Sequence, residues 1–368
     1  MSFSIHSFLK DLRWSFYQEL ESQVHDLRYL FLEVTRRCNL QCRHCGSDCG
    51  RDDSQEGLSL ETLQKVLRSV AERFDAKRIM LVITGGEPTV RPDLIEILSF
   101  ARTLGFRLGM VTNGISLDSM MAKRLAAVGM ESVVVSLDGP KECHDWLRAR
   151  EGAFERACRA ITAMRREGIP VVEGITCVTP KSLSRLAETY EIALRTGCNH
   201  WRVFNIFPAG RAKGDPELLL TEQGIHDLVV EMARLREKGK REGLVVNLSE
   251  EGYLGWNWEK KVRDVPYFCR AGVNIAGIMA DGSIAACPNL PPWMSQGTVF
   301  DDDFADVWER RYELFRDRRW TKKGDCADCS EWRVCRGNSL HLWDPDNDQP
   351  YWCHYKIMNN KGVKGVKG

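Results

Sequence analysis

Three cysteines near the N-terminus have a spacing that could hold a metal cluster. Cys38, Cys42 and Cys45 form a Cys-xxx-Cys-xx-Cys run directly after a short apolar stretch. Three thiolates can bind one face of a [4Fe–4S] cube and leave its fourth iron open to an outside ligand, whereas electron-transfer clusters of this type take four cysteines. Zinc usually takes four ligands, often in Cys-xx-Cys pairs, which fits this run poorly. Cys49 creates a competing register of Cys42, Cys45 and Cys49.

A second set of cysteines lies in the last hundred residues. It consists of Cys269, Cys287, Cys326, Cys329, Cys335 and Cys353. No export signal is visible in the sequence, so clustered thiols predict metal binding rather than disulfides. The scattered Cys143, Cys158, Cys177 and Cys198 are expected to be small hydrophobic residues.

Short apolar segments alternate with amphipathic ones between the two cysteine groups. The predicted strands span 29–35, 78–84, 107–112, 132–136, 170–178 and 200–207. Six strand–helix repeats predict an α/β fold, a parallel sheet covered by helices that is either an open doubly wound sheet or a partial barrel. In both folds the chemistry gathers at the carboxyl ends of the strands.

The pattern also predicts how the chain is divided. Apolar residues at a spacing of three and four predict an N-terminal amphipathic helix that packs on the main domain: Ile5, Phe8, Leu9, Leu12, Phe16 and Leu20. The predicted parts are a helical segment 1–28, a barrel 29–240, a linking segment 241–268, an irregular cysteine-rich domain 269–354 and a disordered tail 355–368.

Composition narrows the classes of function. The net charge is +1, with 43% hydrophobic and 28% charged residues, which argues against nucleic-acid binding through a broad basic surface. No apolar run approaches the roughly 20 residues that a membrane helix needs. We therefore predict a cytoplasmic protein with no membrane span and no nucleic-acid partner.

The first cysteine run and three later stretches resemble, in order, the motifs of the radical S-adenosylmethionine superfamily. The run is followed by Gly85-Gly86-Glu87-Pro88, by Asn113 after the third predicted strand, and by Ser136 and Arg148 after the fourth. The resemblance implies a partial (β/α)6 TIM-like barrel. It also implies a [4Fe–4S] cluster whose open iron chelates S-adenosylmethionine, which one electron cleaves to a 5′-deoxyadenosyl radical that removes hydrogen from a substrate.

The same resemblance implies roles for the motif residues. Gly85, Gly86, Glu87 and Pro88 would receive the amino group of S-adenosylmethionine, with Glu87 as a carboxylate beside the ammonium. Ser136 would bond a ribose hydroxyl or the carboxylate. Asn113 would be a further cofactor contact, and Arg148 would pair with the ligand's carboxylate. His44 would stand in the place of the aromatic ring that the family sets against adenine.

The second cysteine set resembles the SPASM extension, which binds two auxiliary clusters through seven cysteines. Six positions match, and Ser339 stands where the seventh is expected. The resemblance assigns Cys326, Cys329, Cys335 and Cys353 to one auxiliary [4Fe–4S] cluster. Cys269 and Cys287 would bind a second cluster only if another ligand, such as Ser339, completes the site; their spacing also resembles the shorter twitch extension. A zinc ribbon of the last four cysteines is the alternative.

SPASM-bearing relatives mostly modify peptides, so we expect a peptide or protein substrate and an electron donor such as flavodoxin or ferredoxin. One alternative is a radical dehydrogenase or epimerase of a small molecule, in which Cys177 or Cys143 could donate a hydrogen atom. A non-catalytic electron carrier or sensor is the other. Asn205 and Arg211 are possible substrate contacts.

Overall fold

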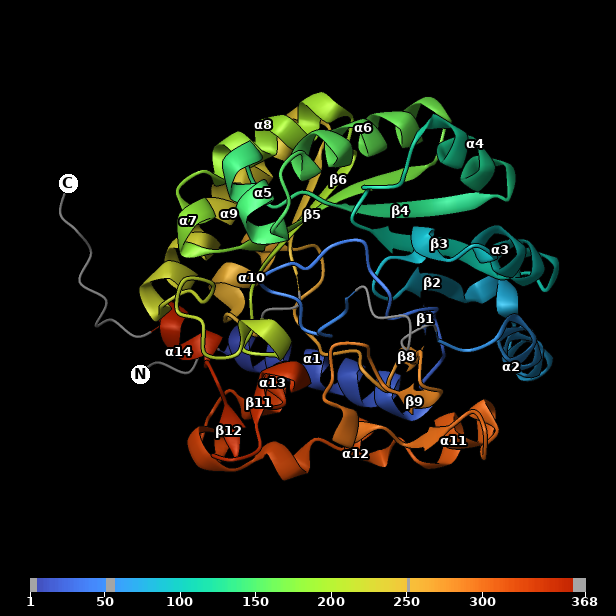
Figure 1. Ribbon diagram of the computed structural model, residues 1–368. Helices are drawn as coiled ribbons and strands as arrows, with labels where there is room; N and C mark the ends of the chain where they lie inside the picture. Colours follow the sequence, from blue (N-terminus) through green and yellow to red (C-terminus); the bar gives the residue numbers. More distant parts are fainter. Residues whose placement is uncertain (1–4, 51–56, 250–251, 360–368) are drawn as a thin grey trace.

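A sheet of ten strands positions the predicted site (Figure 1). The computed structural model describes residues 5–50, 57–249 and 252–359. Six neighbouring strands pair in parallel: β1 (Tyr29–Glu33), β2 (Met80–Thr84), β3 (Arg107–Thr112), β4 (Met130–Ser136), β5 (Val171–Val178) and β6 (His200–Asn205). The predicted α/β fold with a parallel sheet is confirmed. The sheet is curved and stays open, because β10 and β7 form its two edges.

Two further parallel strands extend the predicted set. Strand β7 (Val245–Leu248) pairs with β6, and β8 (Ile275–Ile278) pairs with β1. Strands β9 (Ser283–Ala285) and β10 (Gly297–Thr298) continue the sheet in antiparallel fashion. The cysteine-rich region is therefore joined to the barrel by backbone hydrogen bonds. Residues 241–268, expected as a link, contain β7 and helix α10 (Trp256–Val262); the proposed domain limits stay predictions.

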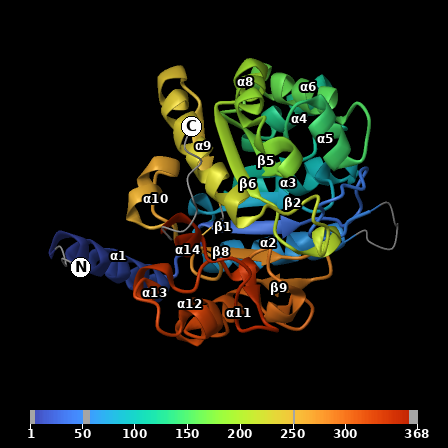
Figure 2. The same cartoon turned by 90° about the vertical axis from the view of Figure 1, so that its left-hand side faces the viewer.

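Helices cover the outer face of the sheet (Figures 1 and 2). They are α2 (Leu60–Arg73), α3 (Leu94–Thr103), α4 (Ser119–Ala127), α5 (Lys141–Arg148), α6 (Ala153–Arg166), α7 (Pro180–Leu183), α8 (Leu186–Thr196) and α9 (Glu222–Glu242). Helix α2 buries Leu63, Val66, Leu67 and Val70 on one face, as its apolar spacing predicts. The C-terminal region adds α11 (Phe304–Arg310), α12 (Glu313–Arg316), α13 (Trp332–Cys335) and α14 (His354–Asn359).

The N-terminal helix α1 (Ile5–Val24) packs with the face opposite to the predicted one. It lies against α13, where the side chain of Gln18 is buried and donates to the carbonyl of Val334 at 2.9 Å. Leu9, Leu12, Phe16 and Leu20 are exposed instead, Phe16 by 69%. Periodicity found the helix but assigned its apolar residues to the wrong side; the buried side of α1 carries Ser15 and Gln18, and Trp14 packs against an aromatic cluster. The side chains of Ile5 and Phe8 lie outside the described part.

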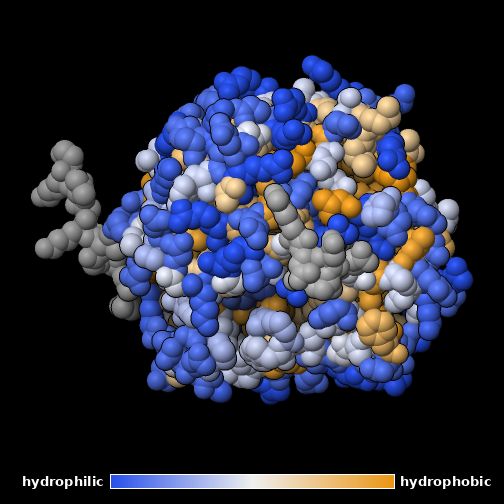
Figure 3. All heavy atoms as spheres, viewed as in Figure 1, coloured by the Kyte–Doolittle hydropathy of each residue, from blue (hydrophilic) through white to orange (hydrophobic). Residues whose placement is uncertain are grey.

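The end of the chain differs from the expected tail. Helix α14 includes residues 355–359, where Ile357 and Met358 are buried, so the predicted disorder is wrong there. Residues 360–368 lie outside the described ranges. Among the residues that the structure describes, no helix is long and apolar enough to cross a membrane. The face seen in Figure 3 is mostly hydrophilic.

Candidate functional site

A cavity of about 690 Å³ lies where the parallel strands end, a size typical of ligand sites. Nine predicted site residues line it: Cys38, Cys42, His44, Cys45, Gly85, Gly86, Asn113, Ser136 and Arg148. Glu87 and Pro88 do not. The parallel fold explains this convergence, because the carboxyl ends of neighbouring strands meet at one edge of the sheet.

The cysteine loop that follows β1 is held from across the barrel mouth by Arg211. Its Nε donates to the carbonyl of Cys42 at 2.7 Å, and its Nη1 donates to the carbonyl of Cys49 at 3.0 Å and to Asp48 Oδ1 at 2.6 Å. The adjacent Gly210 has a φ of +52°, and a Cβ there would lie 2.3 Å from the carbonyl oxygen of Cys45. Arg211, expected as a substrate contact, instead holds the cysteine loop in place through these hydrogen bonds.

Each signature sulfur receives a hydrogen-bond donor. Asn113 Nδ2 lies 3.8 Å from the sulfur of Cys38, Arg148 Nη1 lies 3.8 Å from that of Cys42, and the backbone N–H of Cys49 lies 3.4 Å from that of Cys45. Burial raises the pKa of Cys38 to about 11, while hydrogen bonds from Cys49 lower the pKa of Cys45 to about 5. Donors aimed at sulfur are what tune thiolate ligands of iron–sulfur clusters.

These three thiols fit an open cluster better than a single ion. Among the described residues, a compact group of ligand atoms within 4.8 Å of one another is formed by His44, Asp138 and Cys177 and not by the signature cysteines. The three thiols nevertheless line one cavity and interact electrostatically. Cys49 hydrogen-bonds to Cys45 and also lines the cavity, so the competing register stays a prediction to be tested.

The two motif glycines are required by the cysteine loop. A Cβ on Gly85 would lie 2.3 Å from the carbonyl oxygen of Thr35, and a Cβ on Gly86 would lie 2.3 Å from that of Arg37. The N–H of Gly86 donates to Thr35 at 2.7 Å. We expected these glycines to let backbone approach a ligand. They line the cavity, but the close approach that the structure describes is to residues 35–37.

Glu87 is fully buried behind the cavity, where it organises two loops. Oε1 accepts from the N–H of Thr89 at 3.1 Å, from Thr89 Oγ1 at 2.6 Å and from Thr112 Oγ1 at 2.7 Å, and Oε2 accepts from the N–H of Asn113 at 2.7 Å. Burial raises the pKa of Glu87, and these four donors oppose the rise. The contact with the ligand's ammonium remains a prediction; the geometry supports a positioning role.

Glu87→Ala is therefore expected to unfold more readily, by about 3–5 kcal/mol, because it leaves several buried donors unpaired. Glu87→Gln keeps the shape and one acceptor, and should cost about 1–2 kcal/mol. Urea unfolding of the metal-free protein measures both. Weaker S-adenosylmethionine binding by Glu87→Gln at unchanged stability would contradict this reading and restore the direct contact.

Asn113 and Ser136 differ in whether their side chains already make hydrogen bonds within the protein. Asn113 Nδ2 donates to Asn39 Oδ1 at 2.8 Å, and Asn113 Oδ1 accepts from the N–H of Ile115 at 2.9 Å, so this side chain ties the β3 loop to the cysteine loop. The hydroxyl of Ser136 has no hydrogen-bonding partner within the described ranges and lines the cavity. Ser136 is thus the residue best placed to bond a ligand.

A buried polar group lies beneath Cys42. Arg148 Nε donates to Asp138 Oδ2 at 2.6 Å, and Asp138 Oδ1 accepts from the N–H of Cys177 at 3.0 Å. Burial lowers the pKa of His44 to about 3, so this imidazole is neutral, and its Nδ1 is buried without a partner in the described chain. Arg148 is held by Asp138 but still lines the cavity, so it can reach a ligand's carboxylate.

The remaining predicted residues of the barrel differ in whether they line the cavity. Cys177 lines the cavity. Cys143 does not; its thiol lies 3.8 Å from the carbonyl oxygen of Lys181. Asn205 is buried and does not line the cavity either. Of the two proposed hydrogen-atom donors, the geometry favours Cys177.

Four C-terminal cysteines form one group. Burial first, and then the neighbouring Cys353 and Cys329, raise the pKa of Cys326 to about 11. Cys335 is affected by the same three thiols. Four neighbouring thiols, of which Cys326 is buried and the others are half-buried, can complete either a [4Fe–4S] cluster or a zinc site.

At the second auxiliary position, the residue in place of the seventh cysteine already has a hydrogen-bonding partner. The hydroxyl of Ser339 is buried and hydrogen-bonds to the hydroxyl of Tyr267. The guanidinium of Arg318 lies beside Cys269 and holds the pKa of that thiol below its usual value, although burial alone would raise it. Cys269 and Cys335 both contact the apolar cluster of Tyr253, Tyr267 and Val334. The two thiols at 269 and 287 therefore do not by themselves fit a further cluster.

A parallel sheet with a three-thiol loop and a cavity at its carboxyl edge defines an enzyme class that combines an iron–sulfur cluster with an organic ligand. Residues 32–193 match the Radical SAM superfamily, and residues 269–330 match SPASM, an iron–sulfur cluster-binding domain. The chain belongs to the radical S-adenosylmethionine superfamily and carries a SPASM domain. Its cofactors are [4Fe–4S] clusters and S-adenosylmethionine.

Similar proteins cover most of the chain. The mycofactocin maturase MftC of Mycolicibacterium smegmatis is 30% identical over 318 residues, which are 84% of this chain and 76% of the relative. An AdoMet-dependent heme synthase of Methanosarcina barkeri is 27% identical over 354 residues, 89% and 97% of the two chains. The crystal structure of Streptococcus suis SuiB bound to S-adenosylmethionine has the same fold, with a TM-score of 0.71, 18% identity, and coverage of 91% of this chain and 77% of that one.

Proposed function

We propose that Cys38, Cys42 and Cys45 hold the cluster, that S-adenosylmethionine binds beside them, and that the enzyme modifies a peptide or protein side chain. The choice of a peptide or protein as the substrate rests on one observation. The cavity that holds the three thiols is also lined by Trp293 and Tyr351, which are 57% and 41% exposed. Exposed aromatic residues beside a pocket are typical of surfaces that contact other polypeptides.

The bound cluster and S-adenosylmethionine would supply a 5′-deoxyadenosyl radical that abstracts hydrogen from the substrate. The chain's own residues orient the ligand and exclude water. Ser136 offers a hydroxyl, and Arg148, held by Asp138, offers a cation for a carboxylate. Ile206 and Phe207 line the same cavity with apolar surface, which protects a reactive species from side reactions.

The C-terminal region completes the wall on the substrate side. The rings of Phe207 and His341 lie 4.6 Å apart, so the barrel and the C-terminal region meet at the cavity. Trp343 is buried there, and Leu290 joins the lining from the segment before Trp293. An auxiliary cluster held by Cys326, Cys329, Cys335 and Cys353 would give the electron released by substrate oxidation a path to leave.

A carboxylated small molecule, such as a tetrapyrrole, is the second candidate. Arg36 and Lys213 line the cavity together with its aromatic residues, and a heme synthase is similar over 97% of its own length. Cations beside apolar walls suit a flat, anionic ligand. If the reaction is an epimerisation, Cys177 is the residue placed to return a hydrogen atom.

Deuterium transfer distinguishes the two substrates. The anaerobic enzyme, reduced by dithionite, is incubated either with deuterated peptides encoded beside its gene or with a deuterated carboxylated porphyrin, and 5′-deoxyadenosine is analysed by mass spectrometry. We expect deuterium from the peptide, and Trp293→Ala should raise the KM for that peptide about tenfold, since a buried aromatic contact contributes 1–2 kcal/mol. Label from the porphyrin alone would reject the peptide.

A further inference from the structure

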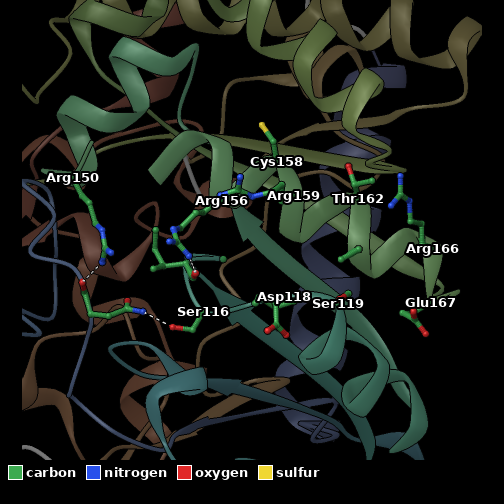
Figure 4. Close-up of a pocket in the computed structure, with 15 residues that line it drawn as sticks. Ser116, Asp118, Ser119, Arg150, Arg156, Cys158, Arg159, Thr162, Arg166 and Glu167 are labelled. Carbon is green, nitrogen blue, oxygen red and sulfur yellow. Dashed lines mark hydrogen bonds between the residues drawn. The ribbon is translucent and has the colours of Figure 1, made fainter. Parts of the chain in front are cut away.

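A second cavity, of about 860 Å³, lies between helix α6 and the loop that joins β3 to α4 (Figure 4). Its charged lining consists of Arg150, Arg156, Arg159 and Arg166, with Asp118 and Glu167. Figure 4 shows Arg150 at one end and Arg166 with Glu167 at the other, with Arg156 and Arg159 between them. We call this feature the arginine groove. It is separate from the cavity that holds the signature thiols.

The cations of the arginine groove are available to a partner. Arg156, Arg159 and Arg166 are exposed. Arg150 and Arg156 donate to the carbonyls of Asn39 and Ile115, at 3.1 and 3.3 Å. In the described part of the chain, none of the four guanidinium groups lies within 4.0 Å of a carboxylate, whereas Asp118 caps α4 by accepting from the N–H of Met121. The groove therefore presents excess positive charge.

The arginine groove reaches the cysteine loop through one residue of that loop. Asn39, which follows Cys38 directly, lines the groove. Asn39 Nδ2 donates to Ser116 Oγ at 3.0 Å. Asn39 Oδ1 accepts from Asn113 Nδ2 at 2.8 Å, and the same Nδ2 lies 3.8 Å from the sulfur of Cys38. Hydrogen bonds through Asn39 and Asn113 therefore connect the groove to a signature thiol.

We propose that the arginine groove is the docking surface for a small acidic protein that delivers single electrons to the cluster; this rests on the function proposed above. Charge complementarity selects the partner, because exposed arginines steer an acidic protein and fix its orientation. Electron transfer weakens steeply with distance, so a donor seated beside Asn39 is well placed. The donor's reduced centre loses one electron and the cluster gains it; no atom passes between the proteins.

The test uses flavodoxin as the acidic probe. Its hydroquinone gives up one electron and becomes the neutral semiquinone. The variant Arg156→Glu/Arg159→Glu/Arg166→Glu reverses three groove charges. The control, Arg68→Glu/Arg241→Glu/Arg310→Glu, makes the same change in net charge at exposed positions on α2, α9 and α11. Two readouts are taken for each protein: the Kd for flavodoxin by calorimetry at two salt concentrations, and cluster reduction by stopped-flow absorbance.

We expect the groove variant to bind flavodoxin at least tenfold more weakly and to be reduced by it at least tenfold more slowly, with a smaller salt dependence. The control should match the wild type, and dithionite should still support S-adenosylmethionine cleavage in all three proteins. Equal losses in the control, or no loss in the groove variant, would overturn the docking site. Failure of dithionite-driven cleavage in the wild type would instead contradict the proposed function, and calorimetry would still decide the groove.

Discussion

Replacing Cys38, Cys42 and Cys45 together by alanine is expected to abolish formation of 5′-deoxyadenosine from S-adenosylmethionine. The three thiols line one cavity, and each accepts a hydrogen bond from a fixed donor. Without them no site of three thiolates with an open iron remains in the barrel. The measurement is 5′-deoxyadenosine by chromatography after anaerobic reconstitution, with dithionite as the reductant. Iron bound to the C-terminal cysteines should be retained.

Two single variants decide the register of this cluster. Cys49→Ala should keep cleavage, because Cys49 serves as a hydrogen-bonding neighbour of Cys45, and Cys38→Ala should lose it. The reverse pattern would establish the set of Cys42, Cys45 and Cys49. Persistent cleavage in the triple variant would refute the assignment of the catalytic cluster.

Local patterns were sufficient for the parts of the fold that depend on local chemistry. Apolar runs predicted all six central strands, and loop motifs placed at strand ends predicted which side chains share the cavity. Parallel topology makes that inference possible, because it brings the carboxyl ends of successive strands together. The pairing of β8 with β1 joins residues about 245 positions apart in the chain, and no local pattern carries such information.

The functions of individual site residues were harder to predict, since they depend on partners from elsewhere in the chain. Glu87 looks like a ligand contact in sequence, but four donors from two loops surround it. Arg211 looks like a substrate contact, but it donates hydrogen bonds to carbonyls of the cysteine loop. The arginine groove was not predicted from the sequence, because Arg150 follows α5 while the other three arginines lie on α6. Three of them share one face of that helix, which helical spacing could have revealed.

Iron content is expected to fall by half when the C-terminal cluster loses its ligands. The intact protein should bind about eight irons, four at the signature cysteines and four at Cys326, Cys329, Cys335 and Cys353. Cys329→Ala/Cys335→Ala should bind about four, because two of the four thiolates are removed. Iron and sulfide per chain are measured after reconstitution, with Mössbauer spectra to identify the cluster type. About four irons with bound zinc in the intact protein would support the zinc ribbon instead.

Ser339 provides the matched comparison for that measurement. Its hydroxyl is bonded to Tyr267, and an alkoxide is a harder and more basic ligand than a thiolate, so serine holds iron–sulfur clusters less readily. Ser339→Ala should therefore keep all of the iron. Ser339→Cys should add about four irons, since it supplies the third thiolate of the second site that the family resemblance assigns to Cys269 and Cys287. About twelve irons in the unaltered protein would mean that another residue completes a second auxiliary cluster. A loss of iron in Ser339→Ala would identify the hydroxyl itself as that ligand.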